Sequence, residues 1–409
     1  MFIDSPKPTD NQESFLPLAL LKHDLICFSH LRWDFVFQRP QHLLKRAAKN
    51  RRVFFVEEPV FDNGTMRLDI TERDGGVQVV VPHLPAGLSS QIAQDVVMRD
   101  LLRHLLKSKE LNEYVIWYYT PMALSYTSEL NPQAIVYDCM DELSAFKNAP
   151  SALSNFEQEL FQKADLVFTG GRSLYLAKKS HHHSVHCFPS SIDRDHFMKA
   201  RVTNDDPIDQ KDIAHPRLGF FGVIDERFDV ELLDVLAQSR PDWNFVLLGP
   251  VVKIDPVILP RHKNIYYLGS KNYQELPRYI AGWDIALLLF ANNEATRFIS
   301  PTKTPEYLAA GKPVVSTPIC DVVSPYGEMN LVHIANGPDD FINAIEGLLD
   351  RNENRAEWLS RVDDYLSFTS WDDTWSQMSA LIDEVIEKRS AKVIADSNAI
   401  SKHAGTASI

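Results

Sequence analysis

The segment from Ser300 to Gly311 combines a helix start with a cation and a carboxylate at helical spacing. Ser300 is a good N-cap residue, and Pro301 suits the first position of a helix. Such a helix end attracts an anion, because its N–H groups are free and the helix dipole is positive there. Lys303 is locally unfavourable unless an anion faces it, and Glu306 follows one turn later. The segment predicts a site for a phosphate and a hydroxylated group, with an ordinary solvated helix as the alternative.

A second group with chemical potential follows the apolar stretch near residue 134. Asp138, Asp141 and Glu142 place three carboxylates within five residues. Clustered like charges raise the pKa of one member, which suits a general base. We predict that Asp141 takes a proton from a substrate hydroxyl. Asp138 is expected to hold the loop, and an Asx-turn without chemistry is the alternative for both.

The loop from His30 to Gln41 carries aromatic, basic and amide groups after the first apolar stretch. Trp33 could stack on a sugar face, and Arg39 could meet a phosphate or a carboxylate. His30 is a second candidate base. The alternatives are apolar packing for Trp33 and a buried, satisfied imidazole for His30.

Charge and cysteine content exclude several classes of function. The net charge is −13, so the chain is a poor general nucleic-acid binder. The 4 cysteines are far apart and form no CxxC pair, which excludes a disulfide scaffold or a cysteine-rich zinc module and fits a cytoplasmic location. The run His181–His183 with His186 has the wrong spacing for three ligands on one helix face, so a solvated helix end is expected. No metal site is predicted.

The elements that must position these residues alternate between strand and helix along the whole chain. DLICFS, QHLLKRAAKN and RVFFVEEP read as strand, helix and strand within the first 60 residues, and the alternation restarts at RLGFFGVID (217–225). The pattern predicts an α/β protein with two doubly wound domains. Ligands of such sheets bind outside the carboxyl ends of the strands, so the site is expected in a cleft between the domains.

SPTKTPEYLAAGKPVVST resembles the donor-binding helix of GT-B glycosyltransferases of the family 4-like group, also called group 1. The resemblance covers residues 215–388 in order. It includes FFGVID, with Gly222 as the glycine turn, and LGSKNYQELPRYIAGWDIALLLF (268–290). It implies two Rossmann-like domains facing across a cleft. It also implies that Glu306 binds the ribose hydroxyls and Lys303 the diphosphate of a nucleotide-sugar.

Two departures from that family's pattern affect the expected site. Phe298 stands where a glutamate is usual, so a carboxylate normally near the transferred sugar is missing. Val223 follows the glycine turn where an arginine is usual, and Arg227 or Arg297 are the candidate replacements. Whether the sugar is transferred with retention or inversion of configuration stays open.

The resemblance implies a particular order of domains along the chain. The expected parts are a loose tail (1–20), an acceptor domain (21–203), a linker (204–214), a nucleotide-sugar-binding domain (215–368), a helix crossing back onto the first domain (369–388) and a disordered tail (389–409).

The implied function is sugar transfer from a nucleotide-diphosphate sugar to a polysaccharide or lipid-linked glycan in cell-envelope or exopolysaccharide synthesis. No cofactor or metal is expected, because the one D-x-D match, Asp193 to Asp195, leads out of the first domain. The alternatives are a nucleotide-sugar epimerase or hydrolase of the same fold, or a non-catalytic nucleotide-sugar-binding subunit. The basic residues Lys45, Arg46, Lys49, Arg51 and Arg52 form either a solvated helix end or a peripheral contact with the inner face of a membrane.

Overall fold

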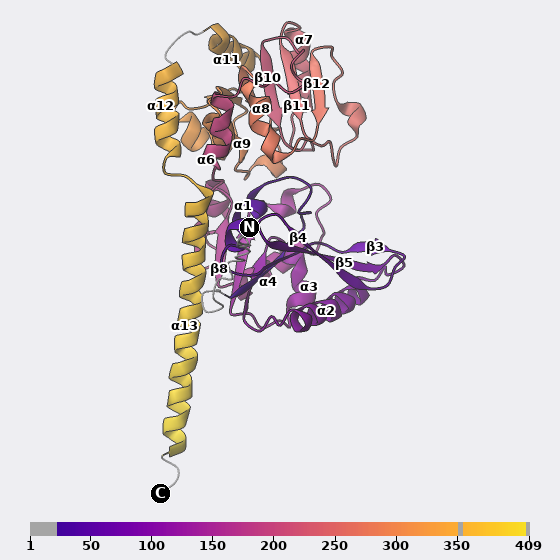
Figure 1. Ribbon diagram of the computed structural model, residues 1–409, viewed down its shortest axis with the longest axis vertical. Coiled ribbons are helices and arrows are strands. Elements are labelled where there is room, and N and C mark those ends of the chain that lie inside the picture. The colour runs from indigo at the N-terminus through magenta and orange to yellow at the C-terminus, as the bar shows by residue number, and fades with distance from the viewer. Residues whose placement is uncertain (1–22, 351–354, 406–409) are drawn as a thin grey trace, which may run out of the picture.

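Two β-sheets, one fully parallel and one parallel except for β4, lie in two α/β domains that follow one another along the long axis of the molecule (Figure 1). The computed structural model describes residues 23–350 and 355–405. The predicted loose tail, 1–20, therefore lies outside the described residues. The domain arrangement matters for function because the carboxyl ends of both sheets are directed toward the space between the domains.

The N-terminal sheet has, within the described residues, nine strands in the order β3-β5-β2-β1-β6-β7-β8-β9, with β4 paired to β5. Its central strands are runs of apolar residues buried on both faces, as parallel sheets covered by helices require. The strands are β1 (Asp24–Phe28), β2 (Val53–Val56), β3 (Val60–Asp62), β4 (Arg67–Arg73), β5 (Val77–Pro85), β6 (Tyr114–Tyr118), β7 (Ala134–Cys139), β8 (Leu166–Thr169) and β9 (Val185–Cys187).

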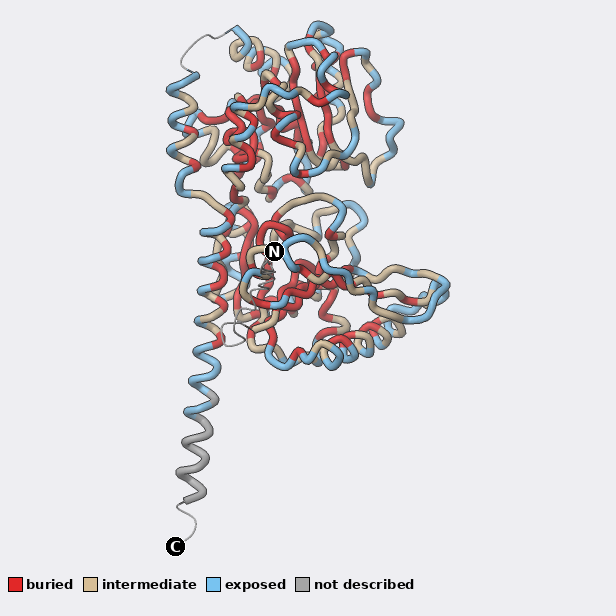
Figure 2. The backbone as a smooth tube through the Cα atoms, viewed as in Figure 1, coloured by how far each residue is buried: buried red, intermediate tan, exposed pale blue. Residues whose placement is uncertain are grey.

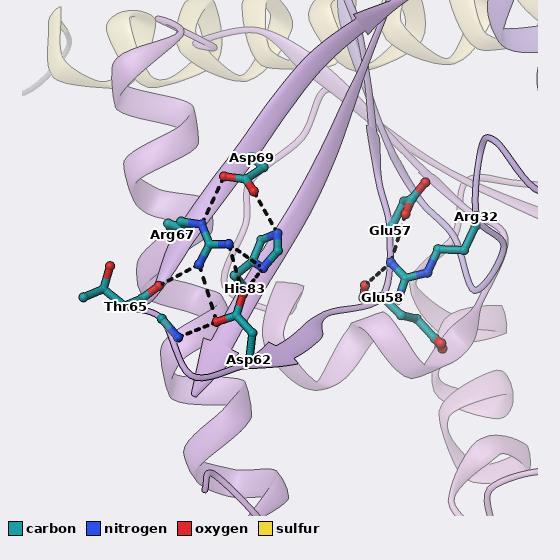
Figure 3. Close-up of polar contacts among 9 residues, drawn as sticks. Arg32, Glu57, Glu58, Asp62, Thr65, Arg67, Asp69 and His83 are labelled. Carbon is teal, nitrogen blue, oxygen red and sulfur yellow. Dashed lines mark hydrogen bonds and ion pairs between the residues drawn. The ribbon is translucent and has the colours of Figure 1, made fainter. Parts of the chain in front are cut away.

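A projecting arm made of β3, β4 and β5 was not expected from the sequence. β4 runs antiparallel to β5, and the turn between them uses Gly75 and Gly76 at φ of 86° and 79°, a conformation that favours glycine. Figure 3 shows how side chains stabilise the arm: His83 of β5 lies between Asp62 and Asp69, and Arg67 binds both carboxylates. None of these four side chains lines the cavity that holds the candidate site residues.

Helices cover both faces of the N-terminal sheet (Figure 1). They are α1 (Arg39–Ala47), α2 (Gln91–Ser108), α3 (Leu124–Thr127), α4 (Leu153–Lys163) and α5 (Arg172–Lys178). The next helix, α6 (Arg194–Met198), packs instead against the C-terminal domain, where Phe197 joins the core. Helix α1 begins directly after the loop that holds the predicted acceptor residues, and Pro40 lies in its first turn. Helix α6 begins within Asp193–Asp195, so this D-x-D match is a helix start.

The C-terminal sheet is fully parallel and has, among the described residues, six strands in the order β12-β11-β10-β13-β14-β15. Gly219 in its central strand leaves room for the indole of Trp283, since a Cβ at this position would lie 1.8 Å from the ring. The strands are β10 (Arg217–Phe221), β11 (Asn244–Leu248), β12 (Ile265–Gly269), β13 (Ile285–Leu288), β14 (Val314–Ser316) and β15 (His333–Ile334).

The helices of the C-terminal domain pack on both sides of that sheet, as a doubly wound fold requires. They are α7 (Val230–Ser239), α8 (Leu276–Ala281), α9 (Lys303–Ala309), α10 (Cys320–Val322), α11 (Pro338–Asp350) and α12 (Arg355–Leu366). The predicted linker, 204–214, folds onto this domain. Gln210 is buried there and accepts a hydrogen bond from the indole of Trp283 at 2.9 Å.

The last helix, α13 (Trp371–Gly405), leaves the C-terminal domain and runs along the N-terminal one (Figure 1). Trp371, Trp375 and Met378 of its first turns are buried in the N-terminal core, and the burial changes to exposed further along (Figure 2). The structure contradicts the predicted disordered tail over 389–405, because the helix continues to Gly405. Neither proline nor glycine interrupts this stretch, and extending a packed helix needs no new nucleus.

Candidate active site

A cavity of about 460 Å³ lies between the two domains. Its walls come from the loop after β1 and the start of α1, the loop after β7, the turns after β10 and β11, and the start of α9. These are the carboxyl ends of strands and the helix starts that follow them, where ligands of open α/β sheets bind. Five predicted donor-binding residues, Gly222, Arg227, Ser300, Lys303 and Glu306, line this cavity.

Lys303 is the first residue of α9 and lies against the glycine turn after β10. Its ammonium nitrogen is 5.6 Å from the ring centroids of both Phe220 and Phe290. Gly222 has φ of 136°, and a Cβ there would lie 2.2 Å from Lys303 Cε. Burial, and then the neighbouring Arg227, lower the pKa of Lys303 to about 8. A lysine held in this way is a fixed cation that an incoming anion would stabilise.

Glu306 lies one turn further along α9 and is 5% exposed. Its Oε2 atom is buried without a hydrogen-bond partner. Burial raises the pKa of Glu306 to about 8, while the charge of Lys303 opposes that rise. Buried carboxyl oxygens are nearly always hydrogen-bonded in proteins, so an orphan in a cavity wall indicates a group that a ligand completes.

Helix α9 begins later than the sequence predicted. Lys303 is its first residue, so Ser300 is not the N-cap and Pro301 is not the first helical residue. The Ser300 carbonyl oxygen instead accepts a hydrogen bond of 2.7 Å from the Ser190 hydroxyl of the N-terminal domain. Ser300 therefore lines the cavity as part of a contact between the domains.

The two candidate arginines occupy different places. Arg227 lines the cavity, where buried Asp225 holds it in a bidentate pair at 2.8 to 3.2 Å. The guanidinium of Arg227 also lies 5.3 Å from the ring centroid of Phe146 in the N-terminal domain. Arg297 does not line the cavity; its side chain is 63% exposed and lies 3.6 Å from Glu294. The donor assignment of Arg297 is thus contradicted, because Arg297 follows directly after a short 3-10 turn (Glu294–Thr296) and its side chain faces solvent.

The three carboxylates after β7 separate into different environments. Asp138 is fully buried, and Arg39 donates to it from Nε at 3.0 Å and from Nη2 at 2.9 Å. The remaining Arg39 Nη1 donates to the Phe188 carbonyl oxygen at 2.8 Å. The structure therefore corrects the acceptor-binding role of Asp138, because this pair satisfies its carboxylate inside the domain. Arg39 also lines the cavity, and its acceptor-binding role stays a prediction. Asp138 is absent from the cavity wall in the described residues.

Asp141 is the carboxylate of this group that reaches the cavity. Burial raises the pKa of its carboxyl, and the charge of Arg227 across the cavity opposes that rise. A half-buried carboxylate with a raised pKa, facing cations on the opposite wall, has the properties of a general base. Asp141 and the Lys303–Glu306 pair thus approach one space from two domains.

His30 lies outside the cavity wall, whereas Trp33 is part of the wall although its ring is almost fully buried. His30 is not among the cavity residues; burial and then the charge of Lys253 lower its pKa to about 4, and its Nδ1 is buried without a partner. The Trp33 ring packs edge-on against Phe55 in the core with centroids 5.0 Å apart, so it offers no free face to a sugar. The exposed aromatic ring of this loop is Phe35, at 44%.

Glu57, after β2, fixes the loop that carries Trp33. One of its oxygens accepts the Trp33 backbone N–H at 2.8 Å, and the other accepts from Arg32 at 2.9 Å. Figure 3 shows Arg32 reaching across to Glu57 and to the backbone oxygen of Glu58. Arg32 and Glu57, which hold this loop, are 25 residues apart in the sequence. No sequence pattern links the two, so their pairing could not be predicted.

Phe298, which replaces the usual glutamate, packs against the core of the N-terminal domain. It is not part of the cavity wall. A contact between domains therefore occupies the position from which a carboxylate would have faced the transferred sugar.

No metal site was expected, and the residues 23–350 and 355–405 contain no group of three His, Cys, Asp or Glu side chains able to hold a metal ion.

The basic residues around the end of α1 are engaged within the chain. Lys45 pairs with Asp74, Arg46 and Lys49 with Asp372, Arg52 with Asp24, and Arg51 donates to Ser379.

Sequence reasoning missed three residues at the interface between the domains: Phe146, Lys253 and Tyr273. Phe146 lies between the cations of Arg227 and Lys253, at 5.3 Å from each. Tyr273 lines the cavity, and its ring stacks on Phe37 with centroids 4.2 Å apart. These are ordinary aromatic and basic residues in loops, and they become neighbours only when the two domains meet.

Residues 215–351 match the model of a protein family described as glycosyl transferases group 1. The match runs from β10 to the end of α11 and includes Gly222, Lys303 and Glu306. Over this stretch the chain is similar to the group 1 glycosyl transferases. The predicted resemblance is confirmed, and the matched region contains the unpartnered Glu306 carboxyl and the half-buried Lys303.

A curated relative extends the similarity beyond that domain. The putative teichuronic acid biosynthesis glycosyltransferase TuaH of Bacillus subtilis (strain 168) is 27% identical over 260 residues. The matched stretch covers 58% of this chain and 64% of that protein, so it spans somewhat less than two thirds of the relative.

Solved structures match over nearly the whole chain. Sucrose-phosphate synthase from Thermosynechococcus elongatus gives a TM-score of 0.66 at 13% identity, covering 90% of this chain and 100% of that one. A UDP-forming α,α-trehalose-phosphate synthase from Burkholderia xenovorans gives 0.64 at 13% identity, covering 89% and 99%. At this identity the likeness shows the fold, which is GT-B with two Rossmann-like domains, as the sequence predicted.

Proposed function

We propose that the protein is a glycosyltransferase that moves a sugar from a nucleotide-diphosphate sugar to a glycan acceptor. The observation that carries this proposal is the shared cavity. One wall presents the cations Lys303 and Arg227 with the unpartnered carboxyl of Glu306, and the opposite wall presents Asp141. The cations can bind an anion, the Glu306 carboxyl can accept hydrogen bonds from two hydroxyls, and Asp141 can remove a proton.

The donor is assigned to the wall of the group 1 domain. Lys303 and Arg227 neutralise the diphosphate, and they stabilise the transition state most because negative charge builds up on the diphosphate as it leaves. Glu306 accepts hydrogen bonds from the ribose hydroxyls, which gives its buried oxygen the partner it lacks. The family match over this domain and the name of the UDP-forming structural neighbour support a nucleoside diphosphate as product.

The acceptor is assigned to the N-terminal wall, with Asp141 as the base for its hydroxyl. Its class, a cell-envelope polysaccharide or a lipid-linked glycan, is supported by the name of the Bacillus relative. Among the described residues no helix has the length and apolar character needed to cross a bilayer. Contact with the inner face of a membrane remains part of the proposal, and the internal pairing of the basic residues near α1 argues for a weak contact.

We further propose that the reaction needs no divalent metal. Lys303, Arg227 and the N–H groups near the start of α9 supply the positive charge that a metal ion would otherwise bring to the diphosphate. Turnover is therefore expected to persist in EDTA. A strict Mn²⁺ or Mg²⁺ requirement would overturn this part.

The test combines binding with turnover. A thermal-shift screen with UDP-, GDP-, ADP- and dTDP-sugars identifies the donor, and release of the nucleoside diphosphate is then measured with and without envelope glycan fractions. Acceptor-dependent release supports the proposal. Acceptor-independent release would favour a hydrolase or epimerase, and tight binding without turnover would favour a non-catalytic subunit. Glu294→Gln, in an exposed residue of the same domain, is the control for Glu306→Gln.

A further inference from the structure

The loop that carries Asp141 is held from two sides by buried cations. On one side Arg39 binds Asp138. On the other side Lys178, the last residue of α5, lies 2.8 Å from Glu142. Two of the three clustered carboxylates are thus paired inside the domain, and Asp141, between them in sequence, makes no ion pair or hydrogen bond through its carboxylate with another described side chain.

Lys178 connects this loop to the helix behind it. Its ammonium nitrogen lies 3.0 and 2.9 Å from the two oxygens of Glu157 in α4, and the hydroxyl of Tyr137 donates to Glu157 at 2.8 Å. Two buried carboxylates close to one another need a cation between them. Without Lys178, Glu142 would have to turn toward solvent, and the adjacent Asp141 would turn with it.

The other end of α5 touches the C-terminal domain. Asp321 of α10 accepts the backbone N–H of Ser173, in the first turn of α5, at 2.9 Å. The residue before the helix, Gly171, has no side chain to make that bond. A Cβ on Gly171 would lie 2.1 Å from Asp321 Oδ2 and 2.7 Å from Ser300 Cβ, so the close approach of the two domains depends on this glycine.

We propose that α5 connects the contact between the domains with the position of Asp141. Asp321 fixes the start of the helix when the C-terminal domain is docked, and Lys178 at its end fixes Glu142 and the loop. Lys178 and Asp321 are positioning residues, since neither lines the cavity. The catalytic consequence rests on the proposed function of Asp141. The mechanical connection rests on the contacts alone.

Hydrogen–deuterium exchange of the full chain without substrate tests the connection. The peptide covering 139–147 should exchange at least about fivefold faster in Lys178→Met and in Asp321→Ala than in the wild type. Lys178→Arg keeps a cation and should restore protection. Lys163→Met, which removes an exposed pair with Glu159, and Asp340→Ala, which removes a carboxylate bound to a backbone N–H within the C-terminal domain, are the controls.

The outcomes separate the possibilities. Unchanged exchange of this loop in Asp321→Ala would overturn the connection, because no other route from the C-terminal domain is invoked. If Lys178→Met does not fold, Glu142→Gln takes its place, since it leaves Lys178 paired with Glu157. This readout needs no sugar transfer, so failure of the proposed function would not affect it.

Kinetics then test the consequence for catalysis. Lys178→Met should lower kcat about 100-fold and Asp321→Ala about 10-fold, with nucleotide affinity within twofold of the wild type. The double variant should lower kcat no further than Lys178→Met alone, because both changes act through one helix. Full additivity of the two effects, or an effect on nucleotide affinity in place of kcat, would overturn the proposal.

Discussion

The two walls of the cavity are built in different ways. On the C-terminal wall Lys303 and Glu306 come from one helix; Glu306 Oε2 has no hydrogen-bond partner within the described residues, and Lys303 lies over the rings of Phe220 and Phe290. In the N-terminal domain Arg39 lines the cavity and Asp138 lies behind it; the two come from segments 99 residues apart and satisfy each other. For these two pairs, the group without an internal hydrogen-bond partner marks the ligand contact, whereas the mutually paired charges mark the framework. Arg227 lines the cavity although buried Asp225 pairs with it, and Asp141 is half-buried and forms no side-chain ion pair within the described residues.

The largest effect is expected where the framework charge is removed. Asp138→Asn should lower the free energy of unfolding by about 3–5 kcal/mol, because it leaves the Arg39 guanidinium buried without a counter-charge. Denaturant unfolding followed by circular dichroism measures this change. Asp34→Asn breaks an exposed pair with Arg73 and should change stability by less than about 1 kcal/mol. Similar effects in the two variants would remove the distinction between framework and site.

Removal of the unpaired carboxylate on the same wall should spare stability and affect turnover. Asp141→Asn is expected to lower kcat about 100-fold, the usual scale for a positioned general base, with nucleotide affinity unchanged. Steady-state kinetics with calorimetry of nucleotide binding gives both quantities. Wild-type turnover in this variant would place the base elsewhere. His30, the second candidate base from the sequence, would then be examined next.

On the opposite wall Glu306→Ala should weaken nucleotide binding about 30-fold, which corresponds to the loss of about 2 kcal/mol from hydrogen bonds to a charged group. The fold should be retained, because Glu306 Oε2 has no partner inside the protein to lose. Titration calorimetry provides the affinity, and the exposed Glu294→Ala is the control. Unchanged affinity would contradict the assignment of ribose to Glu306.

The smallest effect concerns pH. Because the pKa of Lys303 is lowered to about 8, the ammonium loses its proton as the pH rises through 8. Diphosphate affinity should therefore fall above pH 8, by at most about tenfold per pH unit for one proton. Lys303→Arg keeps its charge and should flatten this decline. Glu306 also titrates near pH 8 and is the same in both proteins, so the difference between them reports Lys303. Parallel profiles would exclude Lys303 as the titrating group.

Several features that the structure shows had signals in the sequence that were not used. The β4–β5 turn contains Asp74-Gly75-Gly76, a hairpin signature, and β4 alternates Leu68 and Ile70 with polar residues. A strict alternation of strand and helix does not predict the arm, because β4 and β5 follow one another without a helix between them. The extension of α13 beyond Lys388 was likewise readable, since no helix breaker intervenes before Gly405.

The sequence by itself determined the two α/β domains, the group 1 resemblance, and Lys303 and Glu306 at one helix start. These features are local: hydrophobic periodicity and a contiguous motif carry them, and neighbouring residues on one element keep their spacing in the fold. Only the tertiary structure decided that Arg39 and Asp138 bind each other, that Trp33 is buried while Phe35 is exposed, and that Asp321 reaches α5. Those outcomes depend on which distant segments meet and on how much water remains around each charge. Neither can be inferred from the residues that are adjacent in the sequence.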